Sequence, residues 1–414
     1  MNIAVYSHYF TPEIGAPSAR IHDLAKIWVK AGHAVDVITC FPNHPTGRMY
    51  PGYTLGWYMK EKLDDICVHR HRTYITPNSG IFKKTLGHIS YLPSALMLSN
   101  RRVGRPDVVI GTSPTFFAAM AAAFTSMQRN APFIMEIRDL WPAIFVELGV
   151  LRNPQLIRSL EMLELWLYHR ATKLVTVTEA FRKNLIERGI APEKIHNIPN
   201  GADPDFWTPA SEISPLRMEL GLENRFVVLY IGAHGISHAL FRLLEAADRL
   251  KNTPEIRFVF VGDGAEKTAL MAKANELGLN NVLFHNSVDK FGVRNFYGLA
   301  DVCLVPLRKI PLFDAFLPSK MFEIMAMERP IIGSVRGEAA EILNRSHAAV
   351  VVEPEDSAAI AEAVHYLYLH KEKAEMMGKQ GRKFVIKQYS RAVLAEKYEH
   401  VMHEAIEEHQ RRKR

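Results

Sequence analysis

The chain alternates short apolar strands with helical segments, and it does so in two separate series. In the first series, strands rich in β-branched residues are expected at residues 3–7, 34–39, 107–111, 132–137 and 173–178. Helical patterns lie between them, for example at residues 18–31 and 153–170. Because strands that alternate with helices pair in parallel, this series predicts a doubly wound α/β sheet of the Rossmann-like kind.

The strand-helix pattern restarts at residues 226–232. Later strands of this second series are expected at residues 256–261, 281–284, 300–307 and 330–333. Between the two series, residues 199–209 hold three prolines and an Asn-Gly pair, which is typical of a linker. We therefore expect two Rossmann-like domains, residues 1–205 and 206–389, with parallel sheets that face a central cleft.

The last helical segment, about residues 390–414, is amphipathic and ends in the basic run RRKR. Three placements stay open for it: packed back on the first domain, solvated as a terminal helix, or lying on a membrane surface.

Composition limits the class of protein. A chain of 414 residues with 48% hydrophobic and 23% charged residues fits a soluble two-domain enzyme. The net charge of +7 suits an anionic ligand or an anionic membrane surface. No basic stripe with interleaved aromatic residues is present, which argues against nucleic acid as the partner.

The three cysteines, Cys40, Cys67 and Cys303, are scattered in or beside apolar strands. An odd, unpaired set of this kind indicates core packing in a reducing compartment. The N-terminus runs directly into a strand without a signal peptide, and no apolar run approaches the roughly 20 residues of a spanning helix. We therefore expect a cytoplasmic protein.

The segment LPSKMFE, residues 317–323, combines an anion site with a group that can hold a diol. Ser319 is expected at the N-cap of a helix, with Lys320 at its first position beside free backbone N–H groups, an arrangement that suits a diphosphate. Glu323 lies one turn later on the same face, where its two oxygens could accept from neighbouring ribose hydroxyls. The segment predicts a nucleotide-sugar site.

Three other segments add candidates at expected strand ends. Gly15 would let the backbone approach a ligand closely, although it could simply make a turn. Arg138 and Asp139 could orient sugar hydroxyls, or they could pair with each other and cap the next helix. Arg308 and Lys309 could offset diphosphate charge, or they could be ordinary loop cations.

The histidines form no clear metal set. His69 and His71 would share one face of a strand, but neither has a nearby third ligand of clear register, and His44, His234 and His238 do not complete a set. We expect no metal and no cofactor.

Residues 83–102 mix basic and large apolar side chains on an expected helix, including Lys83, Lys84, Arg101 and Arg102. Two interpretations stay open: a surface helix that dips into an anionic leaflet, and an ordinary helix with one core face.

Six motifs in order resemble the retaining glycosyltransferases of family 4, which have the GT-B fold. They are PEIG at 12–15, RDLWP at 138–142, IPNGAD at 198–203, FVGDG at 260–264, YGLADV at 297–302 and PSKMFE at 318–323. FPNHPTG at 41–47 and RDLWP carry a closer likeness to the branch that builds bacterial O-antigen, capsule or exopolysaccharide, including N-acetyl-fucosamine transferases. The resemblance implies metal-independent sugar transfer from a nucleotide diphosphate donor, with retention at the anomeric carbon.

The resemblance also implies roles for single residues. Glu323 would hold the donor ribose, Ser319 and Lys320 the diphosphate, and Arg138 with Asp139 the donor sugar. The candidate catalytic residues are Asp139, Arg138 and Glu13, and the candidate donor-binding residues are Gly15, Arg308, Lys309, Ser319, Lys320, Glu323, Asp314, Gly262 and His234.

Two positions depart from the family pattern. Many members carry an acid eight positions before the ribose-binding Glu, where this chain has Ala315, with Asp314 one residue earlier. The loop at residues 233–238 also lacks the basic pair that relatives often have. We therefore expect Arg308, Lys309 and Lys320 to supply the charge for the diphosphate.

The expected function is retaining transfer of an N-acetylated or deoxy hexose from a UDP-linked donor to a saccharide on a polyprenyl diphosphate carrier. Such an acceptor would place the enzyme peripherally at the inner face of the cytoplasmic membrane. Donor would bind mainly to the second domain and acceptor to the first. Two alternatives stay open: a UDP-sugar epimerase of the same fold, and a non-catalytic nucleotide-sugar-binding protein.

Overall fold

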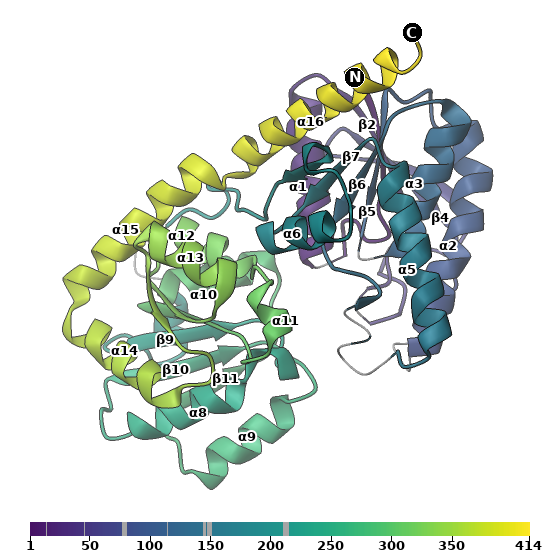
Figure 1. Ribbon diagram of the computed structural model, residues 1–414. Helices are drawn as coiled ribbons and strands as arrows, with labels where there is room; N and C mark the ends of the chain where they lie inside the picture. The colour runs from purple at the N-terminus through teal and green to yellow at the C-terminus, as the bar shows by residue number, and fades with distance from the viewer. Residues whose placement is uncertain are drawn as a thin grey trace. The chain divides into compact units, whose positions relative to one another are not determined.

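The computed structural model describes residues 1–13, 15–44, 46–76, 81–113, 115–143, 146, 151–209 and 215–414, without the side chains of 81–84 and 98–101. The chain divides into two compact units (Figure 1). Unit 1 is Met1–Pro199 with Ala392–Arg414, and unit 2 is Asn200–Arg391. Among the described helices, none is both long and apolar enough to cross a lipid bilayer.

Unit 1 is built on an eight-stranded sheet in the order β3-β4-β2-β1-β5-β6-β7-β8. Its strands are β1 Asn2–Tyr6, β2 Ala34–Cys40, β3 Tyr58–Leu63, β4 Ile66–His71, β5 Val108–Thr112, β6 Phe133–Ile137, β7 Lys173–Thr176 and β8 Ile195–Asn197. All neighbours pair in parallel except β3 and β4. The parallel strands direct their carboxyl ends to one edge, where doubly wound sheets bind their ligands.

The antiparallel β3–β4 hairpin departs from the purely parallel sheet that the sequence predicted. Its two-residue turn is Asp64-Asp65, and both residues have positive φ, 49° and 65°. Hairpin turns of the type I′ class need such angles at both central positions, and Asp tolerates them better than most residues. Leu63 pairs with Ile66 directly beside the turn, so the turn fixes the register of the hairpin.

Helices cover both faces of the unit 1 sheet. They are α1 Ala16–Lys30, α2 Ile81–Arg102, α3 Phe116–Arg129, α5 Pro154–Arg170, α6 Glu179–Glu187 and α16 Arg391–Arg411. On one face, Trp28 of α1 and Tyr398 of α16 are buried in one apolar cluster with the strands. Their rings meet edge to face at 5.3 Å, and the Trp28 indole N–H donates to the Ala395 carbonyl at 3.3 Å. The last helix therefore completes unit 1.

Unit 2 has a six-stranded, fully parallel sheet in the order β11-β10-β9-β12-β13-β14. Its strands are β9 Phe226–Ile231, β10 Ile256–Val261, β11 Val282–His285, β12 Val302–Pro306, β13 Ile331–Ser334 and β14 Ala349–Val352. The expectation of two α/β domains with parallel sheets is confirmed, with the β3–β4 hairpin as the exception.

Unit 2 packs its helices on both sides of its sheet. They are α7 Pro215–Glu219, α8 Leu240–Arg249, α9 Lys267–Glu276, α10 Lys290–Leu299, α11 Pro311–Asp314, α12 Lys320–Ala326, α13 Gly337–Ser346, α14 Ser357–Leu369 and α15 Lys371–Gln388. The two faces have separate apolar cores, one centred on α10 and α12 and the other on α8 and α14. The short helix α12 is held between its strand layer and α15, which fixes the segment expected to bind donor.

The unit boundary lies between Pro199 and Asn200, whereas the sequence placed it after residue 205. The difference arises because Ala202 pairs with Ser390 as an isolated parallel bridge, which ties the start of the linker to the end of unit 2. Helix α1 begins two residues before the expected position, because Pro17 fits the first turn of a helix, where its missing N–H costs nothing.

Candidate active site

Three loops and one helix at the carboxyl edge of the unit 2 sheet carry most of the residues expected to bind the donor. The loop after β9 is tied to the loop after β10, because Gly232 N–H donates to the Val261 carbonyl and His234 N–H to the Asp263 carbonyl, both at 2.9 Å. The loop after β12 joins them where Arg308 N–H donates to the Ser237 carbonyl at 3.0 Å. The backbone at this edge is therefore fixed before any ligand arrives.

Two glycines allow these loops to approach so closely. A Cβ atom on Gly262 would lie 1.9 Å from the Gly232 carbonyl oxygen, and one on Gly264 would lie 2.3 Å from the His234 carbonyl oxygen. Gly262 and Gly264 also have positive φ, 144° and 158°. Only glycine fits such positions without moving the backbone, so Gly262 shapes the edge through its missing side chain.

Lys320 points into this edge from the start of α12. Its ammonium donates to the Ile231 carbonyl at 2.9 Å and lies 4.5 Å from the centroid of the Tyr230 ring. A Cβ atom on Gly232 would come within 2.5 Å of Nζ, so glycine there leaves room for the cation. Desolvation lowers the pKa of Lys320 to about 8, although Glu323 partly opposes the shift.

Glu323 lies one turn further along α12. Tyr297, which is almost fully buried, donates its hydroxyl to Oε2 at 3.3 Å and so orients the carboxylate. Desolvation raises the pKa of Glu323 to about 6, against the opposing charges of Arg391 and Lys290. Within the described residues, neither Lys320 nor Glu323 takes part in an ion pair. Both charges are thus desolvated and lack an ion-pair contact, although they act on each other at longer range.

Ser319 occupies the N-cap position of α12, as expected, but it does not cap the helix. Its backbone is helical, with φ −59° and ψ −30°, and its side chain makes no capping hydrogen bond. An N-cap residue that caps with its side chain has extended backbone angles instead, which explains the difference.

His234 lies in the loop after β9, fully buried. Within the described chain, neither ring nitrogen has a hydrogen-bonding partner of normal geometry, although the Val261 backbone is close enough to raise its pKa slightly. Desolvation and the nearby Lys267 and Lys320 lower the pKa overall. A neutral, unpaired imidazole at this edge can donate or accept one hydrogen bond from a ligand.

Arg308 and Lys309 turn toward the loop after β14. Arg308 Nε lies 3.6 Å from Glu355, and Lys309 Nζ lies 3.7 Å from Glu353, while the Lys309 N–H donates to Glu355 at 2.9 Å. Both cations therefore have carboxylate partners, unlike Lys320. Their expected contact with the donor stays a prediction, and the structure favours Lys320 as the cation for a diphosphate.

Asp314 ends the short helix α11, directly before Ala315. A Cβ atom on Gly337, at the start of α13, would lie 2.0 Å from the Asp314 carbonyl oxygen. Gly337 has a φ of 59°, so the backbone of α13 passes tightly against α11. This contact fixes the backbone of Asp314. Whether the Asp314 side chain replaces the acid that many family members carry at the position of Ala315 stays a prediction.

In unit 1, Glu13 joins two loops at the carboxyl ends of β1 and β2. Its Oε1 accepts from the backbone N–H groups of Asn43 and His44 at 2.7 and 2.8 Å, and Oε2 accepts from Phe10 N–H at 3.2 Å. Burial raises the pKa of Glu13 to about 7, and these three donors oppose the shift. The contacts support a bracing role, and the catalytic role expected of Glu13 stays a prediction.

Gly15 occupies the N-cap position of helix α1 with a φ of 154°, and its expected close approach to a ligand stays a prediction.

Further along α1, Arg20 forms a buried ion pair with Glu136. Arg20 and Glu136 are fully buried, and Nε lies 3.0 Å from Oε2. The Arg20 guanidinium also donates to the carbonyls of Pro199 and Ile198 at 2.6 and 2.8 Å. This pair ties α1 and β6 to the end of the chain segment that leaves unit 1.

Arg138 and Asp139 follow β6 at the same edge of the unit 1 sheet. The Arg138 backbone N–H donates to Ser113 Oγ at 2.7 Å. Burial raises the pKa of Asp139 to about 6, and the charge of Arg138 opposes the shift. Beside them, Trp141 stacks on Phe116 at 4.5 Å. Their expected contact with the donor sugar stays a prediction.

Sequence reasoning missed three contributors to these edges. It did not pair Arg20 with Glu136, although an acid in the otherwise apolar strand FIMEI was a signal for a buried cation. It did not assign Tyr297, whose hydroxyl has no signature in the sequence. Gly232 was also missed, because its role depends on where Lys320 lies.

Helix α2 is the helix whose basic and apolar residues suggested a membrane contact. The side chains of Lys83, Lys84 and Arg101 lie outside the described residues. The Arg102 guanidinium stacks over the Tyr58 ring at 4.0 Å, within unit 1. Arg102 therefore packs the end of α2 against β3, and the membrane role of the helix stays a prediction.

Comparison with known proteins identifies the class. The model for glycosyl transferases group 1 matches residues 214–384, and that for the glycosyl transferase 4-like domain matches residues 15–201. The chain is 27% identical to a putative colanic acid biosynthesis glycosyl transferase, WcaI, of Escherichia coli (strain K12), over 79% of this chain and 81% of that protein. It is 23% identical to the O-antigen chain mannosyltransferase C of Escherichia coli, over 92% of this chain and 91% of that protein.

The fold agrees with these matches. Anabaena HepE, solved in complex with UDP and glucose, has a TM-score of 0.72 at 16% identity and covers 98% of this chain and 100% of its own. The protein is therefore a glycosyltransferase with the GT-B fold. The two matched domains support its membership of glycosyltransferase family 4. The glycosyltransferase assignment decides against the two alternatives that the sequence left open, a UDP-sugar epimerase and a non-catalytic nucleotide-sugar-binding protein.

Proposed function

We propose that the protein transfers a sugar, with retention at the anomeric carbon, from a UDP-linked donor to a lipid-carrier-linked saccharide of a bacterial surface polysaccharide. The similarity to WcaI, a putative colanic acid biosynthesis glycosyl transferase, and to the O-antigen chain mannosyltransferase supports the acceptor class. The UDP and glucose bound to HepE support the donor class. The finer likeness to N-acetyl-fucosamine transferases, carried by residues 41–47, belongs to the same proposal.

One observation carries the donor half: Lys320 and Glu323 present a cation and a carboxylate from one turn of α12, and neither is neutralised. A partly desolvated ammonium beside the Gly232 backbone suits a diphosphate. A carboxylate held by Tyr297 suits two vicinal hydroxyls of a ribose. The unpaired His234 ring adds one hydrogen bond to a phosphate or to the donor sugar.

The transfer step requires the C–O bond between the anomeric carbon and the diphosphate to break while the acceptor oxygen attacks. Lys320 offsets the charge that grows on the leaving diphosphate, and a leaving phosphate oxygen accepts the proton of the acceptor hydroxyl on the same face. The protein contributes position and electrostatic stabilisation rather than a nucleophile. Asp139 and Arg138 orient sugar hydroxyls, and no bound metal is needed for this step.

The proposal is tested in two stages. A thermal-shift screen against UDP-, GDP- and dTDP-sugars identifies the donor, because a ligand that binds only the folded state stabilises it. The donor is then incubated with saccharides on a polyprenyl diphosphate, and the anomeric configuration of the product is determined by NMR. We expect UDP release that depends on acceptor, a product with the donor's configuration, and no loss of rate with a chelator.

Two results would contradict the proposal. Isomerisation of the donor without any acceptor would assign a different reaction to the site. Selective stabilisation by GDP- or dTDP-sugars, with no effect of UDP-sugars, would remove the donor class while leaving the glycosyltransferase assignment intact.

A further inference from the structure

Three side chains with metal-binding atoms meet on one face of the unit 1 sheet, away from the loops described above. Asp36 on β2 lies opposite Cys67 on the neighbouring strand β4. Cys67 and His69 are two residues apart in the same strand. Because opposite residues and residues two apart project to the same side of a sheet, all three side chains leave it in one direction.

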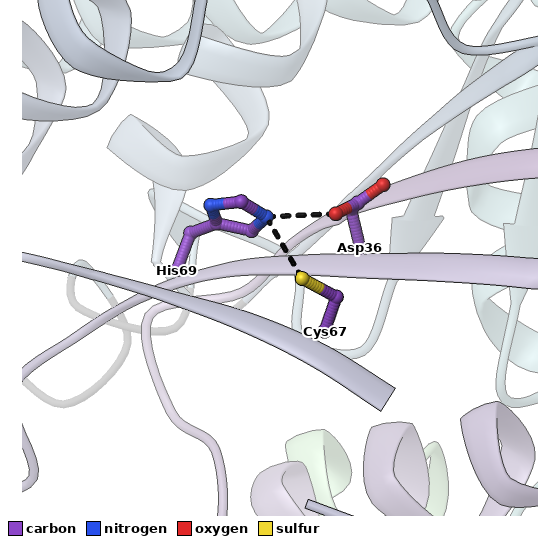
Figure 2. Close-up of side chains that lie close together, drawn as sticks. All are labelled: Asp36, Cys67 and His69. Atoms are coloured by element: carbon purple, nitrogen blue, oxygen red, sulfur yellow. Dashed lines mark hydrogen bonds and ion pairs between the residues drawn. The ribbon is translucent and has the colours of Figure 1, made fainter. Parts of the chain in front are cut away.

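The ligand atoms are close to one another (Figure 2). His69 Nε2 lies 2.7 Å from Asp36 Oδ1 and 3.5 Å from Cys67 Sγ, and all three ligand atoms lie within 4.8 Å of one another. A zinc ion binds sulfur at about 2.3 Å and imidazole nitrogen at about 2.0 Å, so tetrahedral S and N ligands lie roughly 3.5 Å apart. The Cys67–His69 distance already meets this value.

The other ring nitrogen of His69 has a partner of the kind that supports a metal ligand. The Tyr58 hydroxyl lies 2.8 Å from Nδ1. With the proton on Nδ1, the Tyr58 oxygen accepts it, and Nε2 presents its lone pair toward Cys67 and Asp36. Histidines that bind metals usually donate their second N–H in this way, which fixes the tautomer and the orientation of the ring.

The exposure of the three side chains and the charges near them also allow a cation to bind. His69 is fully buried, whereas the Asp36 side chain is 25% exposed, so the carboxylate can withdraw to the wider spacing that a metal needs. Cys67 is half-buried and free. Lys60, exposed on β3 opposite His69, interacts with the Cys67 thiol, and its flexible side chain can move into solvent to make room for a cation.

We propose that Asp36, Cys67 and His69 form a binding site for a thiophilic divalent cation of the zinc class, with water at the fourth position. Binding releases the thiol proton to solvent and leaves a thiolate on the metal. The ion joins β4 to β2, the second and third strands from the β3 edge, near their amino-terminal ends, and so stabilises this side of the unit 1 sheet. This differs from the sequence prediction of no metal, because strand pairing supplies the ligands that spacing alone did not reveal.

The test uses the full chain, prepared without metal and titrated with Zn²⁺ against a chromophoric chelator, and separately with Co²⁺. We expect one equivalent to bind, a thiolate-to-cobalt charge-transfer band in the near ultraviolet, and a higher melting temperature with metal. Cys67→Ser, His69→Gln and Asp36→Asn should each weaken Zn²⁺ binding at least tenfold, and Cys67→Ser should abolish the charge-transfer band.

Cys303→Ala is the matched control, because Cys303 is a buried thiol of unit 2 and should leave binding unchanged. If a ligand variant does not fold, the cobalt band and the stoichiometry of the unaltered protein still decide. No saturable binding, or binding without a thiolate band, would overturn the proposal and leave a hydrogen-bonded cluster only. Binding that all three ligand variants retain would overturn it as well.

Discussion

The two units present the same kind of sheet edge but treat buried charge differently. In unit 1, Arg20 is fully paired with Glu136 and two carbonyls, and Glu13 accepts three backbone N–H groups. In unit 2, Lys320 and Glu323 are desolvated without an ion-pair partner in the described chain, and their pKa values move toward the neutral forms. Two carboxylates of unit 1 share this pKa shift, because burial raises the pKa of Asp139 to about 6 and that of Glu13 to about 7, but the Glu13 oxygens are held by backbone N–H groups.

The difference separates buried charges that stabilise the fold through their partners from buried charges that lack an ion-pair partner and can bind a ligand. Removing one member of a paired, buried set leaves its partner unsatisfied and destabilises the protein. Removing a desolvated charge that has no partner relieves the folded state and weakens binding instead. Substitutions in the two units should therefore move stability and donor affinity in different directions.

The largest effect is expected from Arg20→Met. It leaves Glu136 buried without its cation and frees two carbonyls, so the free energy of unfolding should fall by about 3–5 kcal/mol. Urea denaturation followed by circular dichroism measures the change. Arg182→Met is the control, because its pair with Glu179 is surface-exposed and should contribute less than about 1 kcal/mol. Equal effects of the two variants would remove the distinction for unit 1.

Gly262→Ala tests whether the unit 2 edge depends on close backbone approach. The new Cβ would meet the Gly232 carbonyl oxygen, so we expect a loss of about 3 kcal/mol in stability, together with weaker UDP binding. Gly235→Ala is the matched control in the loop after β9. It has no atom within 4 Å of the added Cβ and an ordinary φ of −132°, so it should be nearly neutral. A neutral Gly262→Ala would contradict the packing described for these loops.

The pH dependence of UDP affinity should be bell-shaped in the unaltered protein. The site works with Glu323 ionised and Lys320 protonated, and their pKa values are about 6 and about 8. Affinity should therefore fall below pH 6 and above pH 8, by up to about tenfold per unit. Calorimetric titrations across this range measure it. Affinity that is flat from pH 5 to 9 would exclude both groups from the donor site.

Glu323→Gln should give the smallest effect, a gain in stability. The pKa of Glu323 is raised from 4.5 to about 6 in the folded protein. Its favourable contribution is therefore present below pH 4.5 and is lost as pH rises through 6. Gln resembles the protonated carboxyl and does not ionise, so the variant keeps this contribution at high pH. At pH 8 it should be about 1–2 kcal/mol more stable than the unaltered protein, and at pH 4 the two should be equally stable. Lower stability at pH 8 would show that Glu323 supports the fold.

The sequence predicted the layers of both units because apolar period and turn residues are local signals. It also placed Lys320 and Glu323 on one turn of a helix, since that relation depends only on spacing. The β3–β4 hairpin was missed because Asp64-Asp65 is a weak turn signal. The Arg20–Glu136 pair joins residues 116 positions apart, and the partners that Arg308 and Lys309 find depend on where the loop after β14 lies. Contacts of that kind come from tertiary packing, which spacing does not report.

The most direct test measures UDP affinity and unfolding free energy on the same preparations of unaltered protein, Lys320→Met and Lys309→Met. Desolvation lowers the pKa of Lys320 in the folded state, so its charge costs stability below pH 8. At pH 7 we predict that Lys320→Met is at least as stable as the unaltered protein and binds UDP about tenfold to a hundredfold more weakly. Lys309→Met should weaken UDP binding less than Lys320→Met does, because the Lys309 ammonium has Glu353 as a partner. Lower stability of Lys320→Met with unchanged UDP affinity would contradict the account.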